Sequence, residues 1–241
     1  MTEIFTRTAM LIGEEALQIL AEKRVAVFGI GGVGGYVTEA LVRCGIGAVD
    51  LIDNDVVSVS NINRQIIATH RTVGRYKTEV MKERIGDINP DCRVYVHNCF
   101  YLPETADQFD FTEYDYVVDA IDTVTGKIQL ILQAKEAGVP IISSMGTGNK
   151  LNPTMLEITD IYKTSVCPLA KVMRRELKKR GVEKLKVLYS KEEPRKPVST
   201  ETKDMQEENG RRSTPGSVAF VPAAAGLIIA SEVVKELGHI S

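Results

Sequence analysis

Val25-Ala-Val-Phe-Gly-Ile-Gly-Gly-Val-Gly34 joins a short apolar run to a cluster of glycines. The apolar part, Val25 to Ile30, predicts a strand that is buried on both faces, as the strands of parallel sheets are. Apolar residues then recur at helical spacing from Val33 to Cys44, and Gly45 is placed to end that helix. A strand, a glycine-rich turn and a helix in this order predict the first βαβ unit of an α/β fold.

Strand-like and helix-like segments alternate through the rest of the first 150 residues. One helix carries an apolar stripe that stops at Asn89 and Pro90, and another stops at Gly138. The predicted strands lie at residues 49–52, 94–96, 116–120 and 141–144. This order predicts a Rossmann-like, doubly wound and mainly parallel sheet with helices on its faces.

The pattern changes after residue 149, where further strands and helices extend the sheet. The predicted elements are strands at 155–159 and 186–189, a basic helix at 169–180 between them, and a closing helix from about Pro222 to Leu237. Residues 190–217 contain only two sizeable apolar side chains, Val198 and Met205. Since two such side chains cannot offset the entropy lost on ordering, we expect a mobile crossover loop there.

Composition is typical of a globular protein. Of the 241 residues, 44% are hydrophobic and 26% are charged, which excludes collagen-like and wholly disordered chains. The length fits one large α/β domain better than two domains. We therefore expect a single domain over residues 1–241, with a Rossmann-like core at 24–150 and a C-terminal extension at 151–241.

The cysteines and the hydropathy of the chain indicate its cellular compartment. The four cysteines form no CxxC pair and the three histidines have no ligand spacing, which argues against a zinc site and for a reducing compartment. The longest apolar stretch, Val218 to Ala230, contains a proline and a glycine and is shorter than a helix that crosses a bilayer. The N-terminus carries charges and does not resemble a secretory signal. We expect a cytoplasmic protein without stable membrane insertion.

The net charge of −2 is unevenly distributed along the chain. Residues 171–196 contain eleven basic and four acidic side chains, a net +7, so the rest of the chain carries −9. A basic segment on an acidic body favours a polyanionic partner, although a solvated helix face would have the same composition.

Three glycines, Gly29, Gly31 and Gly34, form a GxGxxG pattern directly after the first predicted strand. Glycines let the backbone approach phosphate groups, and the N-terminus of the following helix supplies N–H donors and the positive end of its dipole. Asp53 ends the second predicted strand, where a carboxylate can accept hydrogen bonds from ribose hydroxyls. The pattern predicts a nucleotide site but does not distinguish NAD from ATP.

Three further charged residues favour ATP chemistry over hydride transfer. Arg64 follows the second strand, Lys77 stands at the head of a helix, and Asp122 follows the strand at 116–120. Because ligands of a doubly wound sheet bind beyond the carboxyl ends of the strands, Asp53 and Asp122 should face the same crevice. An arginine and a lysine that hold a triphosphate, with a carboxylate for Mg²⁺, suit adenylyl transfer, in which catalysis is mainly positioning and charge stabilisation.

These motifs together resemble the adenylation core of the ubiquitin-activating family and its bacterial relatives in thiamin and molybdopterin biosynthesis. The matching motifs, within about residues 5–150, are Gly29-Ile-Gly-Gly-Val-Gly34, Asp53-Asn-Asp55, Ser60-Asn-Ile-Asn-Arg-Gln65, Lys77 and Asp119-Ala-Ile-Asp122. The resemblance implies that Asp53 holds the ribose and that Asp122 holds Mg²⁺. It also implies a homodimer in which Arg7 reaches the ATP of the partner.

The resemblance gives the following candidate residues. The candidate nucleotide-binding residues are Gly29, Gly31, Gly32, Gly34, Asp53, Asp55, Asn61, Arg64, Gln65, Lys77 and Asp122. Asn61, Arg64 and Lys77 would hold the phosphates of ATP. The candidate catalytic residues are Arg7, Arg64, Lys77 and Asp122.

One branch of this family fits the chain best. Members that activate a ubiquitin-like carrier usually carry two CxxC pairs for zinc, and this chain has none. Instead, Gly45-Ile-Gly47, Ile88-Asn-Pro90, Asp160-Ile-Tyr-Lys-Thr164 and Pro168-Leu-Ala170 resemble the tRNA threonylcarbamoyladenosine dehydratases. That resemblance implies ATP-dependent cyclisation of threonylcarbamoyladenosine at position 37 of tRNA. The carboxylate would be adenylated with release of pyrophosphate, and ring closure would expel AMP.

The basic segment would then lie along tRNA phosphates. The candidate tRNA-binding residues are Arg174, Arg175, Lys178 and Lys179. Two other interpretations stay open, namely adenylation of the C-terminus of a ubiquitin-like sulfur-carrier protein, and a noncatalytic or NAD-binding Rossmann module. The sequence also leaves open a monovalent cation, sulfur-transfer partner proteins and a chemical role for Cys167.

Overall fold

The computed structural model describes residues 3–196, 198 and 215–240. This part of the chain forms one seven-stranded sheet in the order β3-β2-β1-β4-β5-β7-β6. The strands are β1 Arg24–Phe28, β2 Ala48–Ile52, β3 Arg93–His97, β4 Tyr116–Asp119, β5 Ile141–Ser144, β6 Leu156–Asp160 and β7 Lys186–Ser190. Neighbouring strands are parallel except for β6, which pairs with β7 in the antiparallel direction. The expected doubly wound, mainly parallel α/β sheet is confirmed.

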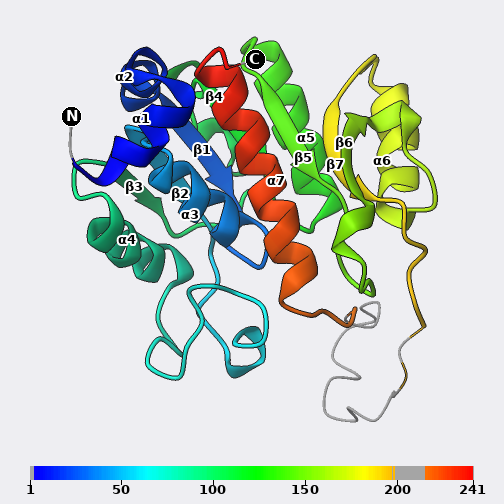
Figure 1. The fold of residues 1–241 in the computed structure, drawn as a ribbon. Helices are drawn as coiled ribbons and strands as arrows, with labels where there is room; N and C mark the ends of the chain where they lie inside the picture. Colours follow the sequence, from blue (N-terminus) through cyan, green and yellow to red (C-terminus); the bar gives the residue numbers. More distant parts are fainter. Residues whose placement is uncertain (1–2, 197, 199–214, 241) are drawn as a thin grey trace.

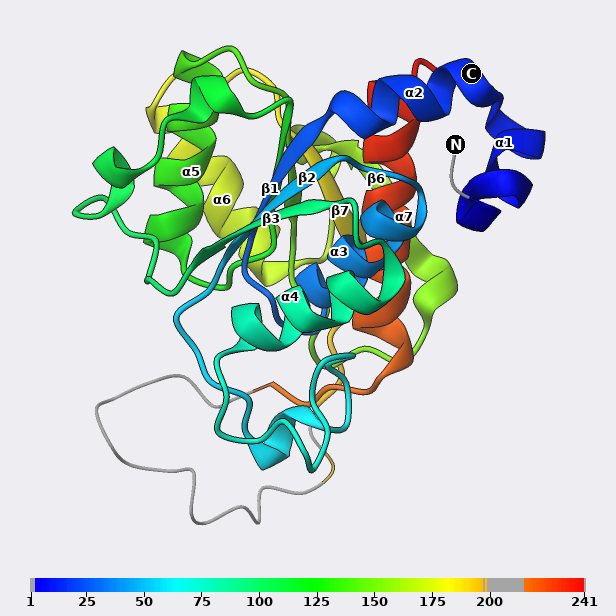
Figure 2. The same cartoon turned by 90° about the vertical axis from the view of Figure 1, so that its left-hand side faces the viewer.

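Helices cover both faces of the sheet, as Figures 1 and 2 show. They are α1 Thr6–Ile12, α2 Glu14–Glu22, α3 Gly34–Arg43, α4 Lys77–Ile88, α5 Val124–Glu136, α6 Pro168–Lys179 and α7 Phe220–Leu237. One core lies between the sheet and α3, α4 and α7, and the other lies between the sheet and α5 and α6. Along β1 the side chains alternate between the two cores, because successive residues of a strand point to opposite faces.

The ends of the predicted elements agree with the structure to within two residues. The first strand ends at Phe28, two residues earlier than expected, because Gly29 turns the chain with a φ of 90°. The two N-terminal helices, α1 and α2, were not predicted. They are separated by Gly13, whose φ of 85° interrupts the helical path. None of the described helices is long and apolar enough to cross a membrane.

The expected crossover loop begins later than residue 190, which corrects the prediction. Ser190 is the last residue of β7, and Glu192 is buried. The Glu192 carboxylate accepts hydrogen bonds from the backbone N–H groups of Leu151 and Asn152, at 3.0 and 2.8 Å. The N–H of Arg195 donates to the carbonyl oxygen of Asn149 at 2.8 Å, so the chain is held to the rest of the protein as far as Arg195. Most of the loop predicted at 190–217 lies outside the described residues.

Helices α3 and α7 lie close together on one face of the sheet (Figure 1). Gly226 makes this approach possible, because a Cβ atom there would lie 2.6 Å from the carbonyl oxygen of Val33 and 2.7 Å from the Cβ of Tyr36. Since α3 begins at the glycine-rich turn, the packing of α7 against α3 also supports that turn.

We expect Gly226→Ala to lower the free energy of unfolding by about 1–3 kcal/mol, because the added methyl group overpacks the α3–α7 contact. Gly86→Ala is the matched control. Gly86 lies in α4 with open space around its Cβ position, so alanine there should raise the free energy of unfolding by about 0.5–1 kcal/mol. Urea unfolding of both variants measures the difference, and equal stabilities would contradict the role given to Gly226.

Candidate functional site

A cavity of about 790 Å³ lies at the carboxyl ends of β1, β2 and β4. Ligands bind at this edge of doubly wound sheets. Of the candidate residues, those that line the cavity are Gly29, Gly31, Gly32, Asp53, Asp55, Asn61, Arg64, Gln65, Lys77 and Asp122. Gly34 and Arg7 do not line it. Segments that are more than 90 residues apart in the sequence thus meet around one space.

The glycines of the turn have different roles. Gly29 has a φ of 90°, and a Cβ atom there would lie 2.7 Å from the carbonyl oxygen of Ala120. A Cβ atom on Gly34 would lie 1.7 Å from the carbonyl oxygen of Gly29, so Gly34 serves the packing of α3 against β1. The nearest atom to a Cβ on Gly31 would be 3.8 Å away, which leaves this stretch of backbone open to the cavity. A ligand phosphate can therefore approach the backbone at Gly31 and the N-terminal end of α3.

Asp53 is held by the backbone around it. Its two carboxylate oxygens accept hydrogen bonds from the N–H groups of Ile30, at 2.7 Å, and Asp55, at 2.8 Å. Burial raises the pKa of Asp53, and the positive charge of Lys77 and the two backbone hydrogen bonds partly offset that rise. The carboxylate is thus fixed beside the glycine-rich turn, where it can accept from hydroxyl groups of a bound ligand.

Lys77 supplies a buried positive charge at the first position of α4. Its Nζ donates to the Asp55 carboxylate at 2.6 Å and lies 3.9 Å from the Asp53 carboxylate. The two carboxylates balance the positive charge of this lysine, which is only 5% exposed. An anionic ligand that entered the cavity would meet Lys77 already positioned by the two carboxylates.

The segment between β2 and α4 supplies three further polar side chains. Arg64 Nη1 donates to the carbonyl oxygen of Ser60 at 2.8 Å and to Asn63 Oδ1 at 2.9 Å, and Arg64 lines the cavity. Asn61 Oδ1 accepts from the N–H of Ser58 at 3.1 Å. Gln65 is 7% exposed, and its Oε1 is buried with no hydrogen-bond partner among the described residues.

Asp122 follows β4 and lies at the cavity wall as an exposed side chain. Within residues 3–196, 198 and 215–240, no three or more histidine, cysteine, aspartate and glutamate side chains form a group that could hold a metal ion. A cation at Asp122 would therefore need further oxygen ligands from the bound substrate and from water, as Mg²⁺ usually has.

A fully buried ion pair behind Asp122 was missed by the sequence analysis. Asp119 and Lys127 are both 0% exposed, and Lys127 Nζ donates to Asp119 Oδ1 at 2.9 Å and to the carbonyl oxygen of Ser144 at 2.8 Å. Asp119 Oδ1 also accepts from the N–H of Ile121 at 3.3 Å. The pair therefore ties β4, β5 and α5 to the segment that carries Asp122. A lysine in a helix is normally assigned to solvent, so the sequence offers no signal for it.

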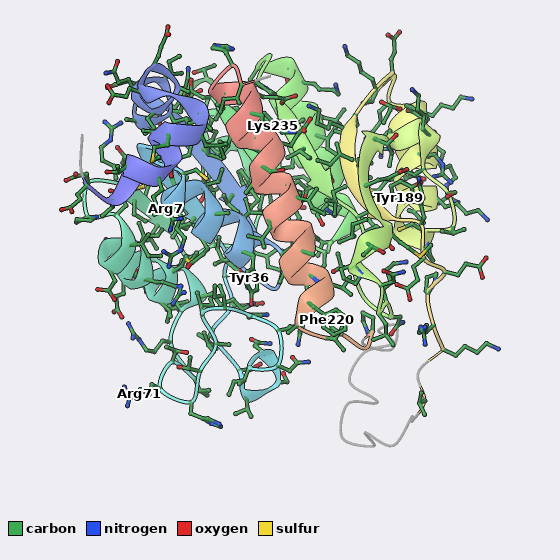
Figure 3. All side chains as sticks on the ribbon, in the orientation of Figure 1. Arg7, Tyr36, Arg71, Tyr189, Phe220 and Lys235 are labelled. Carbon is green, nitrogen blue, oxygen red and sulfur yellow. The ribbon has the colours of Figure 1, made fainter. Side chains whose placement is uncertain are left out.

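The remaining candidates lie away from the cavity. Arg7 is exposed on α1, and Figure 3 shows it on the outside of the molecule. In α6, Arg174 Nη1 donates to the carbonyl oxygen of Thr164 at 3.0 Å, so it is half-buried and occupied by the protein itself. Lys179 and Arg175, together with Arg180, bond Glu176, and these hydrogen bonds lower the pKa of Glu176 to about 2.

Cys167 is 2% exposed and directly precedes α6. Burial at this level keeps a thiol from reagents and substrates, so the structure favours a packing role for this side chain.

We expect Lys127→Met to lower the free energy of unfolding by about 3–5 kcal/mol, because the Asp119 carboxylate would be left buried without a counter-charge. Lys135→Met is the control on the same helix. Lys135 is exposed in the last turn of α5, and its replacement should change stability by less than about 0.5 kcal/mol. Chemical denaturation measures both, and a loss below about 1 kcal/mol for Lys127→Met would refute this account of the pair.

The chain is similar to known proteins over nearly its whole length. The model of the ThiF family matches residues 5–240. The tRNA threonylcarbamoyladenosine dehydratase of Bacillus subtilis is 44% identical over 238 residues, which cover 97% of this chain and 94% of that protein. The adenylyltransferase and sulfurtransferase UBA4 of Candida glabrata is 32% identical over 142 residues, which cover 59% of this chain and 33% of that protein.

Two solved structures of one enzyme resemble this chain over nearly its full length. The crystal structure of the E. coli tRNA N6-threonylcarbamoyladenosine dehydratase TcdA with AMP has a TM-score of 0.88 and 39% identity, and covers 98% of this chain and 94% of TcdA. The complex of TcdA with ATP has a TM-score of 0.86 and 38% identity, and covers 98% of this chain and 93% of TcdA. By the family match over almost its whole length, this chain belongs to the ThiF family.

Proposed function

We propose that the protein is an ATP-dependent tRNA threonylcarbamoyladenosine dehydratase, which adenylates the carboxylate of the modified base and then closes a ring with release of AMP. One observation carries the proposal, namely that a single cavity holds the glycine-rich turn, Asp53, Arg64, Lys77 and Asp122. The likeness to TcdA, which has been crystallised with ATP and with AMP, supports the choice of nucleotide and of substrate.

The chemistry explains why this set of residues is needed. A free carboxylate is a poor electrophile, because its leaving group would be an oxide ion, whereas an acyl-adenylate releases AMP. A nucleophile in the same side chain of the modified base is held near the activated carbonyl and needs no protein thiol. The protein's task is therefore to position the two substrates and to stabilise the negative charge of the phosphates.

The cavity residues can divide this task. The backbone of the glycine-rich turn and the start of α3 would hold phosphate oxygens, and Asp53 would accept hydrogen bonds from the ribose. Arg64 and Lys77 would hold the phosphates from the opposite side. Asp122 is exposed to the cavity and accepts no hydrogen bond from the described residues, so its oxygens are free for Mg²⁺. Mg²⁺ at this position would neutralise charge on the departing pyrophosphate.

The surface of α1 supports a homodimer in which Arg7 acts on the partner's site. No residue of α1 is buried, and its apolar side chains Met10 and Leu11 are 84% and 86% exposed. Large apolar side chains that gather on an exposed helix favour a protein interface. Packing of α1 on a second copy of the chain would cover these side chains. It would also bring Arg7 toward that second copy.

The division of the chain follows from this assignment. We propose that residues 24–150 perform the nucleotide chemistry and that residues 151–241 contribute to holding the tRNA. Within α6, the exposed side chains that could contact phosphates are Arg175, Lys178 and Lys179. Arg174 is less suited to this contact, because its guanidinium is bound to Thr164. We place the reaction in the cytoplasm, where tRNA is modified.

The decisive experiment incubates the purified protein with ATP, Mg²⁺ and tRNA that carries linear threonylcarbamoyladenosine, followed by gentle digestion and mass spectrometry of the nucleosides. We expect a product that is lighter by one water molecule. Asp122→Ala should abolish it, because the phosphate charge would lose its carboxylate-held cation. Unchanged mass in the presence of bound ATP would favour the alternative, adenylation of a carrier-protein C-terminus.

Subunit mixing tests Arg7. Arg7→Ala and Asp122→Ala should each be nearly inactive, whereas a mixture of the two should recover about a quarter of the wild-type rate. Half of the randomly exchanged dimers contain both variants, and each of these has one complete site out of two. No recovery, with subunit exchange demonstrated by gel filtration of tagged chains, would refute the action of Arg7 across the dimer.

A further inference from the structure

The segment Val56–Tyr76, here called the anchored loop, connects β2 to α4 and lies beside the cavity. Its 21 residues include three arginines and one histidine but no aspartate or glutamate, in a chain whose net charge is −2. It extends past the carboxyl edge of the sheet, at the bottom of Figure 1, where it is drawn in cyan. A basic surface thus stands next to the mouth of the candidate site.

The anchored loop is closed and packed at its base. The N–H of Val57 donates to the carbonyl oxygen of Arg75 at 2.8 Å, and the N–H of Gly74 donates to the carbonyl oxygen of Val57 at 2.8 Å. Val57, Ile67 and Ala68 are buried in the core below α3 and α4. The loop therefore presents its outer residues from a fixed platform, which lowers the entropy lost when they bind a partner.

The tip of the anchored loop is a hydrogen-bonded turn that carries Arg71. Thr72 Oγ1 accepts from the N–H of Thr69 at 2.9 Å and donates to the carbonyl oxygen of Ile67 at 2.8 Å. Arg71 lies inside this turn and is exposed. Arg75 pairs with Glu83, whereas Arg71 forms no ion pair with any residue that the structure describes. Figure 3 shows it at the outer edge of the loop, pointing away from the body of the protein.

The same loop supplies both the cavity and this exposed cation. Gln65 lines the cavity, and Arg71 follows it by six residues, so the two are at most about 20 Å apart. A nucleotide that flanks a base held in the cavity falls within this distance. By contrast, α6 ends close to the start of β7, at the opposite edge of the sheet from the cavity. Two of its basic side chains, together with Arg180 directly after it, share Glu176.

Resting on the function proposed above, we infer that the anchored loop is a tRNA-binding surface in which Arg71 contacts backbone phosphates next to the modified adenosine. Arginine suits this contact because its guanidinium donates two parallel hydrogen bonds to a phosphate. Phosphate contacts of this kind position the substrate without reading its sequence. The loop thereby links the position of the tRNA backbone to the side chains of Arg64 and Gln65 that line the cavity.

The test compares Arg71→Ala and Arg71→Glu with the matched control Arg93→Glu. Arg93 is exposed at the start of β3, at the edge of the sheet away from the cavity, so it reports the effect of net charge alone. We expect Arg71→Ala to raise the KM for tRNA about tenfold and Arg71→Glu to raise it further, because a charge-assisted hydrogen bond is lost. The KM for ATP and the rate at saturating tRNA should stay at the wild-type values, as should all constants of Arg93→Glu.

Salt dependence adds a readout that a folding defect would not produce. Loss of one phosphate contact should reduce the slope of the logarithm of tRNA affinity against the logarithm of salt concentration by about 0.7. An unchanged tRNA KM and slope for Arg71→Glu would overturn the inference and leave the loop for a protein partner. An equal effect of Arg93→Glu would also overturn it, because the effect would then be one of net charge.

Failure of the proposed function gives a different result. In that case the wild-type protein itself would form no dehydrated nucleoside. The inference is then judged by the Kd of a labelled anticodon stem-loop, measured by fluorescence anisotropy for the same three variants. Wild-type affinity for Arg71→Glu in that measurement would overturn it, and a weakened Kd that Arg93→Glu does not share would support it.

Discussion

The close backbone contact where β1 passes into α3 determines the rest of the site. Gly29 and Gly34 meet with no room for side-chain atoms, and Ala120 at the end of β4 closes on Gly29 from the other side. Strand β1, the start of α3 and the end of β4 can therefore come together only because two positions lack a Cβ atom. The open glycine between them, Gly31, faces the space that this junction creates.

Charges around that space are arranged in two layers. The outer layer, Asp53, Lys77 and Asp122, lines the cavity and is available to a ligand. The inner layer, Asp119 and Lys127, is completely buried and meets no ligand, but it fixes the segment that carries Asp122. Such a pair costs desolvation energy, and its full set of hydrogen bonds offsets that cost. The position of Asp122 thus depends on charges that never reach the solvent.

The surface divides into parts with different partners. Helix α1 exposes apolar side chains and suits a second copy of the chain, whereas the anchored loop exposes cations beside the cavity and suits a polyanion. Helix α6, the most basic stretch of the sequence, has part of its charge neutralised within the helix by Glu176. Local charge density in the sequence is therefore an incomplete guide to where a nucleic acid would bind.

The sequence by itself determined the order of strands and helices from β1 to β5, the glycine-rich turn and the residues that gather at the strand ends, because periodicity and glycine spacing are local properties. Tertiary structure alone decided three things. It placed β6 antiparallel to β7, and it buried Lys127 against Asp119. It also bound the side chain of Arg174 to Thr164, whereas it left that of Arg71 exposed. Each of these depends on contacts between distant segments. The burial and pairing of a charged side chain follow from such contacts and have no local pattern in the chain.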